Sequence, residues 1–217
     1  MQLSLLSHTQ AARPAADAWD MPRSDWRAGV RPLTSRRVAL RDLTPADAPS
    51  LLSMLAAEEV TRFMSPPPGT IVGFERFIAW MRDEQAAGRH IGFAITPVDR
   101  PDVAIGVIQI RQLTPDFQTA EWGFAIGAPY WGSGLFIEAA QMAMGFAFEV
   151  LNVHRLEARA AIVNGRGNGA LAKMGAVREC VLRNSFMRNG EYLDQALWSI
   201  VREDWQRSKA VWGSSIH

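Results

Sequence analysis

The sequence lacks the residues and runs that mark several large classes of protein. It has one cysteine in 217 residues, Cys180, so it cannot form an internal disulfide, and no CxxC motif or Cys/His cluster predicts a zinc site. No apolar run approaches the roughly 18 residues that a membrane-spanning helix needs. The first residues have no basic segment ahead of their short apolar stretch, so we predict no signal peptide. We therefore expect a protein of a reducing, cytoplasmic compartment that does not bind a membrane.

An excess of charge of either sign is also missing. Lysine and arginine number 23 against 22 acidic residues, so no overall field attracts nucleic acid or an anionic membrane surface, and we expect neither as a partner. With 48% hydrophobic and 21% charged residues, the composition is that of a globular domain. Partners must therefore be recognised locally, by a particular site.

The chain divides into a body and two flanking segments. Residues 1–35 show neither a strand nor a helix period and carry several prolines, so we interpret them as an irregular N-terminal extension that Trp19 and Trp26 attach to the body. We expect residues 36–207 to form one domain and residues 208–217 a C-terminal tail. Within the domain, "VRECVLRN" is typical of a strand, and we expect its Cys180 to be buried.

Between residues 36 and 127 the pattern alternates between helical and strand periods. We expect a strand at 36–44, one helix at 45–64 with Thr44 as its N-cap, and a second helix at 70–87 that ends at Gly88. Alternating apolar residues then predict strands at 90–98, 102–113 and 120–126, joined by short turns. Strands connected in this way form an antiparallel meander.

A glycine-rich loop in the second half of the chain joins a strand to a helix. The segment "GAPYWGSGLFIEAA" covers residues 127–140, the helix that follows runs to about residue 151, and "RLEARAAIV" is then typical of a strand. Together they make a βαβ unit, which requires a parallel pair of strands. Further along, Asn189 and Gly190 predict a tight hairpin between two more strands.

The helix start at this loop is suited to binding an anion. It leaves about four backbone N–H groups without intrahelical partners, and the helix dipole adds a partial positive charge. Gly132 and Gly134 keep side chains out of the approach path, so the amides of residues 132–136 could surround a pyrophosphate. The loop has neither the GKS or GKT of a P-loop nor the GxGxxG of a dinucleotide fold. From these residues alone, a phosphate site and a plain glycine turn both stay open.

Several motifs around the loop occur in an order that resembles the GNAT superfamily of acyl-CoA-dependent N-acyltransferases. They are Glu121 on the central strand, "YWGSG" before a helix, "HRLEAR" on the next strand, Asn164, and "LAKMGA" at the end of a short helix. The resemblance covers residues 36–205 and is greatest to the branch with the ribosomal-protein N-terminal acetyltransferases. It implies a single α/β (α+β) domain with a mixed, mostly antiparallel sheet of about seven strands, helices on both faces, and a βαβ acyl-CoA-binding unit where the parallel strands diverge.

The resemblance also implies which residues bind coenzyme A. In the family the glycine loop holds the pyrophosphate through its amides, which here belong to Gly132, Ser133, Gly134 and Leu135. The family's asparagine, here Asn164, contacts the pantetheine arm or the neighbouring backbone. The other residues expected at the cofactor are Phe124, Ala125, Ile126, Trp131, Phe136, Arg166 and Asn168. For Arg166 and Asn168 the alternative is an ordinary solvated helix end. No metal is expected.

Four positions depart from the family pattern. Relatives often carry a basic residue at Ser133, a small residue at Phe136 and a serine at Gly167, and many carry a tyrosine general acid at Leu171. A thiolate with a pKa of about 8.5 is a tolerable leaving group without protonation, so we assign no general acid. The bulky ring at position 136 is expected to alter the shape of the cleft.

Glu121 is the candidate general base. A lysine-type amine, with a pKa of about 10.4, must lose a proton before it attacks a thioester. Glu121 opens the strand that faces the glycine loop and matches an acidic position used by relatives. The alternative is a strand-end carboxylate held in an ion pair with Arg111 or Arg159. A backbone N–H of the strand around Phe124 to Ile126 would stabilise the oxyanion, as the family geometry implies.

The leading hypothesis is an N-acetyltransferase, a monomer or homodimer, that transfers an acetyl group from acetyl-CoA to a primary amine, either a protein N-terminus or a small molecule. A catalytically quiet acyl-CoA-binding sensor or structural relative is the second hypothesis, prompted by Phe136 and the missing tyrosine, and a nucleotide-binding fold is the third. We expect His90 and His154 to be structural or exposed, and Glu138 to complement the helix dipole.

Overall fold

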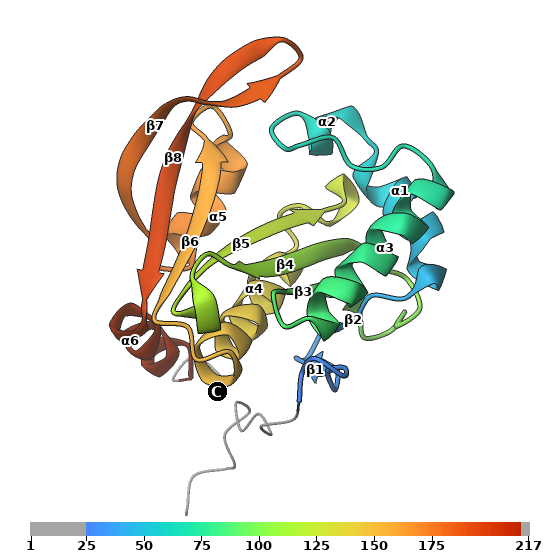
Figure 1. Ribbon diagram of the computed structural model, residues 1–217, viewed down its shortest axis with the longest axis horizontal. Coiled ribbons are helices and arrows are strands. Elements are labelled where there is room, and N and C mark those ends of the chain that lie inside the picture. The colour runs from blue at the N-terminus through green and yellow to red at the C-terminus, as the bar shows by residue number, and fades with distance from the viewer. Residues whose placement is uncertain (1–24, 214–217) are drawn as a thin grey trace, which may run out of the picture.

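The structure, a computed structural model, describes residues 25–213, which contain an eight-stranded sheet flanked by helices (Figure 1). The strand order is β1-β2-β3-β4-β5-β6-β8-β7, and every neighbouring pair is antiparallel except β5 and β6. The strands are β1 (Leu33–Thr34), β2 (Val38–Asp42), β3 (His90–Pro97), β4 (Gly106–Gln112), β5 (Thr119–Ile126), β6 (Arg155–Ala161), β7 (Val177–Arg188) and β8 (Glu191–Val201). The expected mixed, mostly antiparallel sheet is confirmed, and the short β1 extends it by pairing with β2.

Helices cover both faces of the sheet, as expected. The α-helices are α1 (Ala48–Leu55), α2 (Glu58–Thr61), α3 (Ile71–Ala86), α4 (Leu135–Gly145), α5 (Gly165–Lys173) and α6 (Arg202–Gly213). Short 3-10 segments are η1 (Pro45–Asp47), η2 (Pro115–Phe117) and η3 (Ala128–Tyr130), and η4 (Phe146–Val150) is a π-helix. Across residues 25–213, no helix has the length and apolarity to cross a lipid bilayer.

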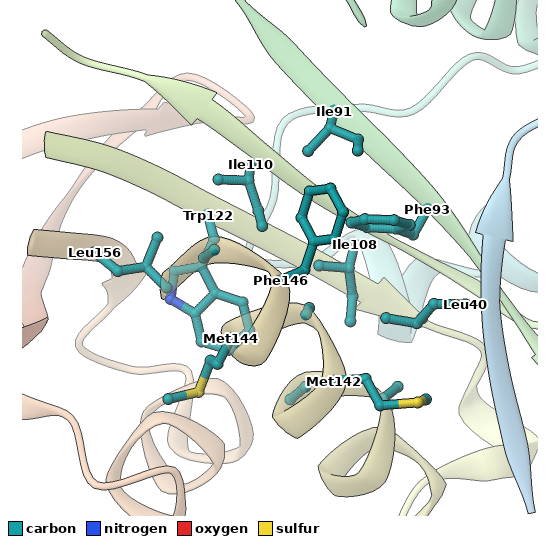
Figure 2. Close-up of a cluster of buried hydrophobic side chains, with 14 of the residues drawn as sticks. Leu40, Ile91, Phe93, Ile108, Ile110, Trp122, Met142, Met144, Phe146 and Leu156 are labelled. Carbon is teal, nitrogen blue, oxygen red and sulfur yellow. The ribbon is translucent and has the colours of Figure 1, made fainter. Parts of the chain in front are cut away.

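Each face of the sheet has its own hydrophobic core. The larger core packs α4 and α6 against the central strands, and Figure 2 shows Phe146 reaching toward Phe93 on β3. These two rings meet edge to face with centroids 5.2 Å apart. The smaller core, with Leu51 and Leu55 of α1 and Phe74 of α3, covers the other face. Because each buried Leu or Phe side chain contributes ~1.5–3 kcal/mol, the two cores hold β4 and β5 firmly from both sides.

The helix after the glycine loop has two parts, where the sequence pattern predicted one. It is α-helical up to Gly145 and continues as the π-helix η4. Phe146, Ala147 and Phe148 are consecutive and all buried, and Phe148 stacks on Trp205 of α6 with ring centroids 5.7 Å apart. This segment is therefore covered by the sheet on one side and by α6 on the other, so its burial does not follow a single helix face.

Two further expectations about secondary structure and burial were wrong. The helix expected at 45–64 begins as η1, which leads directly into α1, and it is broken before α2, because Ala57 adopts an extended conformation with ψ 135° and is the N-cap of that new short helix. Cys180 is exposed, since β7 is an edge strand and most of its side chains face solvent.

The structure describes the expected N-terminal extension from residue 25, where it contributes the short strand β1, and it also contains the hairpin turn. Trp26 is buried and meets Phe117 edge to face at 5.7 Å, so it does attach its segment to the body, whereas Trp19 lies outside the described residues. Asn189 and Gly190, with φ of 51° and 82°, form the turn between β7 and β8.

Candidate functional site

The sheet opens between its only two parallel strands within residues 25–213. β5 and β6 pair from Thr119–Arg155 to Glu121–Glu157 and then diverge. Beyond this point β5 stays paired with β4 as far as Ile126, and β6 with β8 as far as Ala161. The edges of β5 and β6 that face each other are therefore left without a strand partner, and such backbone groups need a partner from elsewhere.

A cavity of about 1150 Å³ lies at this opening and reaches both faces of the sheet. It is lined by Glu121 to Ile126 of β5 and by Ala158 to Ala160 of β6. On the α4 face its walls are the glycine loop and α5, and on the opposite face they are α1, α2, the prolines at 66–68 and α3. A volume of this size suits a large ligand, because drug-sized molecules occupy pockets of ~300–1,000 Å³.

The glycine loop presents free backbone amides to this cavity. Gly132 and Gly134 have φ of 74° and 83°, a left-handed conformation that favours glycine, and Gly134 is the N-cap of α4. The amide of Ser133 donates to the Tyr130 carbonyl and that of Leu135 to the Ser133 hydroxyl, at 3.4 and 3.3 Å. The amides of Gly132, Gly134 and Phe136 have no acceptor among residues 25–213. The free donors therefore alternate along the loop and mark a place for an anion.

Arg37 contacts this loop although it lies 96 positions earlier in the chain, and the sequence pattern did not identify it. Its Nη1 donates to the Ser133 carbonyl at 3.0 Å, and its Nη2 lies 2.5 Å from Oε1 of Glu138 in the first turn of α4. Ser35 donates to the other Glu138 oxygen at 2.7 Å. Although burial alone would raise it, these contacts lower the pKa of Glu138 below its ordinary value. Glu138 thus belongs to a clasp between the β1–β2 turn and the loop, as well as lying in the first helical turn.

On the other side of the loop, Arg166 supplies a positive charge. Its guanidinium carbon lies 4.1 Å from the centroid of the Trp131 ring, and both residues line the cavity. No carboxylate in the described part of the chain forms an ion pair with Arg166. Trp131 is fixed in turn by a 2.9 Å hydrogen bond from its Nε1 to the Ile126 carbonyl at the end of β5. The guanidinium of Arg166 therefore lies beside the glycine loop, in which Ser133 stands where relatives often carry a basic residue.

Asn164 and Asn168 both organise the start of α5. Asn164 is its N-cap, and the side-chain oxygen accepts from the Gly167 amide at 2.9 Å. The Asn168 amide group donates to the carbonyls of Ala161 and Asn164, and its oxygen accepts from Nε1 of Trp198. Asn164 lines the cavity, whereas Asn168 is committed to protein partners and does not.

Phe136 packs against β5. Its ring centroid lies 4.4 Å from that of Phe124, which is in turn 5.0 Å from that of Trp122. Phe124 and Phe136 line the cavity. The large ring that departs from the family pattern therefore forms an aromatic wall of the opening together with Phe124.

Glu121 lies on the cavity wall between two arginines. Arg111 on β4 donates to one carboxylate oxygen, and Nε of Arg159 on β6 lies 3.9 Å from the other. The Glu121 side chain is 16% exposed. Arg111 and Arg159, the two ion-pair partners considered from the sequence, therefore both contact Glu121. If Glu121 accepts a proton, it does so with these two arginines beside its carboxylate.

Among residues 25–213, no tyrosine hydroxyl takes the place of the family's general acid at position 171. Leu171 is buried in the larger core, and Tyr130, which lines the cavity, accepts a 3.3 Å hydrogen bond from Arg100. In residues 25–213, no three His, Cys, Asp or Glu side chains are grouped to hold a metal ion. Most of the residues selected from the sequence do meet at the cavity. They are Glu121, Phe124, Ala125, Ile126, Trp131, Gly132, Gly134, Phe136, Asn164 and Arg166; Ser133, Leu135 and Asn168 do not line it.

Comparison with known families gives a match over most of the chain. The model of the acetyltransferase (GNAT) domain matches residues 37–177. The Bacillus licheniformis protein called uncharacterized N-acetyltransferase p20 is 28% identical over 174 residues, which are 80% of this chain and 97% of that protein. The ribosomal protein uS5-alanine N-acetyltransferase of Escherichia coli (strain K12) is 23% identical over 134 residues, which are 61% of this chain and 69% of the relative.

Solved structures share the arrangement of helices and strands. Mycobacterium smegmatis RimJ in complex with CoA-disulfide superimposes with a TM-score of 0.75 over 87% of this chain and 96% of that chain. The two sequences are 20% identical, so this likeness concerns the fold.

Proposed function

Since the chain belongs to the acetyltransferase (GNAT) domain family, with relatives among the ribosomal-protein alanine N-acetyltransferases, we propose that it transfers an acetyl group from acetyl-CoA to a primary amine, either a protein N-terminus or a small molecule. The free amides of Gly132, Gly134 and Phe136 at the edge of the cavity are the observation that carries this proposal. A side-chain Cβ at Gly132 would meet nothing within 4 Å, so the loop leaves open space where an anion would lie.

The residues of the chain divide the work of binding. The three free amides and the α4 dipole would hold the pyrophosphate, and Arg166 would add a positive charge. Backbone N–H groups of Phe124 to Ile126 that face the opening would orient the pantetheine arm and the thioester carbonyl. When bound, acetyl-CoA supplies a thioester that an amine can attack.

Glu121 would take up the proton that the amine must lose. A primary amine with a pKa of about 10.4 is largely protonated at neutral pH, and general-base catalysis contributes ~10²–10⁴-fold to a rate. Arg111 and Arg159 would keep the carboxylate in place at the cavity wall. The proton would reach it directly or through water.

The variant Glu121→Gln tests this role. It keeps the shape of the side chain, and we expect its kcat to fall about 100-fold at neutral pH and to recover as the pH approaches the pKa of the amine. The KM for acetyl-CoA should not change. Glu157→Gln is the matched control, because Glu157 pairs with Glu121 in the β5–β6 register but does not line the cavity. Full activity of the Glu121 variant at neutral pH would show that Glu121 is not the base.

An acyl-CoA sensor is the second candidate, supported by the buried Leu171 in place of a tyrosine and by the ion pairs of Glu121. Purified protein incubated with acetyl-CoA and a panel of amines and peptides separates the two functions. CoA release with at least one acceptor supports the transferase, whereas calorimetric binding of acetyl-CoA without release favours the sensor. Binding of ATP or NAD in place of CoA compounds would contradict both.

A further inference from the structure

The half of the cavity on the α1 and α3 face is walled by apolar side chains. This acceptor-side wall, as we call it, consists of Val60, Phe63, Met64, Phe74 and Phe77 from α2, the segment after it and α3, with Phe186 of β7. Val60, Met64 and Phe77 are partly buried residues packed on the smaller core. Phe74 is buried within that core, so the wall is the partly exposed edge of a packed core.

Prolines and aromatic contacts fix the shape of this wall. Pro66, Pro67 and Pro68 line the cavity between α2 and α3, and consecutive prolines restrict the backbone. The Phe77 ring meets Phe74 edge to face with centroids 6.4 Å apart. In Figure 1, α2 and the tip of the β7–β8 hairpin face each other above the sheet. The side chain of an acceptor that enters this half of the cavity would contact apolar side chains of α2, α3 and β7.

Charges on this half of the cavity do not suit an acceptor with several positive charges. Glu59 and Glu121 are the carboxylates among its lining residues, and Glu121 is already flanked by Arg111 and Arg159. Arg62 also lines the cavity, with its guanidinium carbon 5.2 Å from the Phe63 ring centroid. A polyamine would bring further ammonium groups toward arginines and apolar rings, where they would lose hydration without gaining partners.

We propose that the acceptor is a primary amine carried on an apolar group, preferably an aromatic one. The group would pack on Phe77 and Met64 while the amine reaches Glu121 at the divergence of β5 and β6. This inference rests on the proposed acetyl transfer and names the acceptor for it. Two sources share the chemistry: a small aralkyl amine, and a peptide whose first residue has a large apolar side chain.

The test compares matched acceptors with the full chain. CoA release is measured by chromatography with 2-phenylethylamine, ethanolamine and spermidine, and with two peptides that differ only in a first residue of Phe or Ser. We expect kcat/KM to be at least about tenfold higher for the phenyl-bearing member of each set, the ratio that corresponds to ~1.4 kcal/mol. Turnover of 2-phenylethylamine but not of the peptide identifies a small-molecule source, and the reverse result identifies a peptide.

A variant of the wall supplies a readout other than turnover. Phe77→Ala should weaken calorimetric binding of 2-phenylethylamine in the presence of CoA about tenfold without changing the affinity for CoA, and Phe77→Leu should restore most of it. Val72→Ala is the control, because Val72 is an exposed apolar residue of the same helix that does not line the cavity. Equal loss in the control would contradict the role of the wall.

The possible failures are distinguishable. If ethanolamine, spermidine or the Ser peptide is acetylated as well as the phenyl-bearing acceptors, the inference is overturned and the proposed transferase function stands. If none of these five acceptors releases CoA but another amine or peptide of the wider panel does, the inference is likewise overturned and the transferase function stands. If acetyl-CoA binds and no member of the wider panel releases CoA, the proposed function fails and the inference fails with it.

Discussion

His90 should make the stability of the protein depend on pH in a defined window. It begins β3, is 6% exposed, and meets the ring of Trp80 edge to face at 5.3 Å. Its Nε2 has no hydrogen-bond partner in the described structure. Burial lowers the pKa of His90 to about 4, with Glu84 raising it and Arg111 lowering it further. The folded protein therefore keeps this imidazole neutral at pH values where the unfolded chain protonates it.

The size and sign of the effect follow from proton linkage. In the unfolded chain the pKa is about 6.5, so between that value and about 4 the unfolded state binds the extra proton, and stability falls as the pH falls through this window. The stabilisation is fully present above the unfolded pKa. The shift from 6.5 to about 4 corresponds to a loss of ~3 kcal/mol at the acidic end.

Urea unfolding followed by tryptophan fluorescence measures this loss. His90→Phe keeps a ring against Trp80 and removes the titrating group, so the free energy of unfolding of the wild type minus that of the variant should fall by ~3 kcal/mol between about pH 7.5 and about pH 4. His154→Gln is the control, because His154 is exposed. A difference that stays constant within ~0.5 kcal/mol over this range would refute the reasoning.

Three further predictions concern the glycine loop and α5. Arg37→Ala should weaken calorimetric binding of CoA about tenfold and leave binding of pantetheine, which lacks the pyrophosphate, unchanged; equal loss for both ligands would contradict a role at the loop. Gly132→Ala and Gly134→Ala should each cost ~1–2 kcal/mol of unfolding free energy for the left-handed backbone, with the larger cost at Gly134, where a Cβ would lie 2.9 Å from Nη2 of Arg37. Arg166→Ala should lower CoA affinity about tenfold without changing the free energy of unfolding in urea. Asn168→Ala should instead lower the free energy of unfolding by ~1–3 kcal/mol. The opposite pattern would assign the cofactor contact to Asn168.

The elements with a clear local pattern could be predicted from the sequence. Alternating apolar residues indicated β3 to β6, and the Asn189–Gly190 pair indicated the hairpin, because strand periodicity and a tight turn are set by residues close in the chain. The break between α1 and α2 could not be predicted in the same way, since no glycine or proline marks Ala57. The exposure of Cys180 depends on β7 being an edge strand, which is a property of the whole sheet.

The candidate site shows the same division between local and distant information. The loop with Gly132 and Gly134 was visible because the glycines and the helix start are adjacent in sequence. The clasp of Arg37 was not, because Arg37 contacts Ser133 and Glu138 across 96 and 101 positions of the chain. The stacking of Arg166 on Trp131 likewise exists only after α5 folds back over the loop. Contacts between distant segments carry no periodic signature.

The short pairing of β5 with β6 also has a mechanical consequence. β1 to β5 form one continuous ladder and β6 to β8 another, and the two ladders meet along a seam from Thr119–Arg155 to Glu121–Glu157. The backbone pairing between the ladders is short, and the larger core, which contains residues of both, holds them together on one face. A ligand lying in the opening would contact both ladders, as a strand between them would. Its binding would therefore oppose movement of one half of the sheet relative to the other.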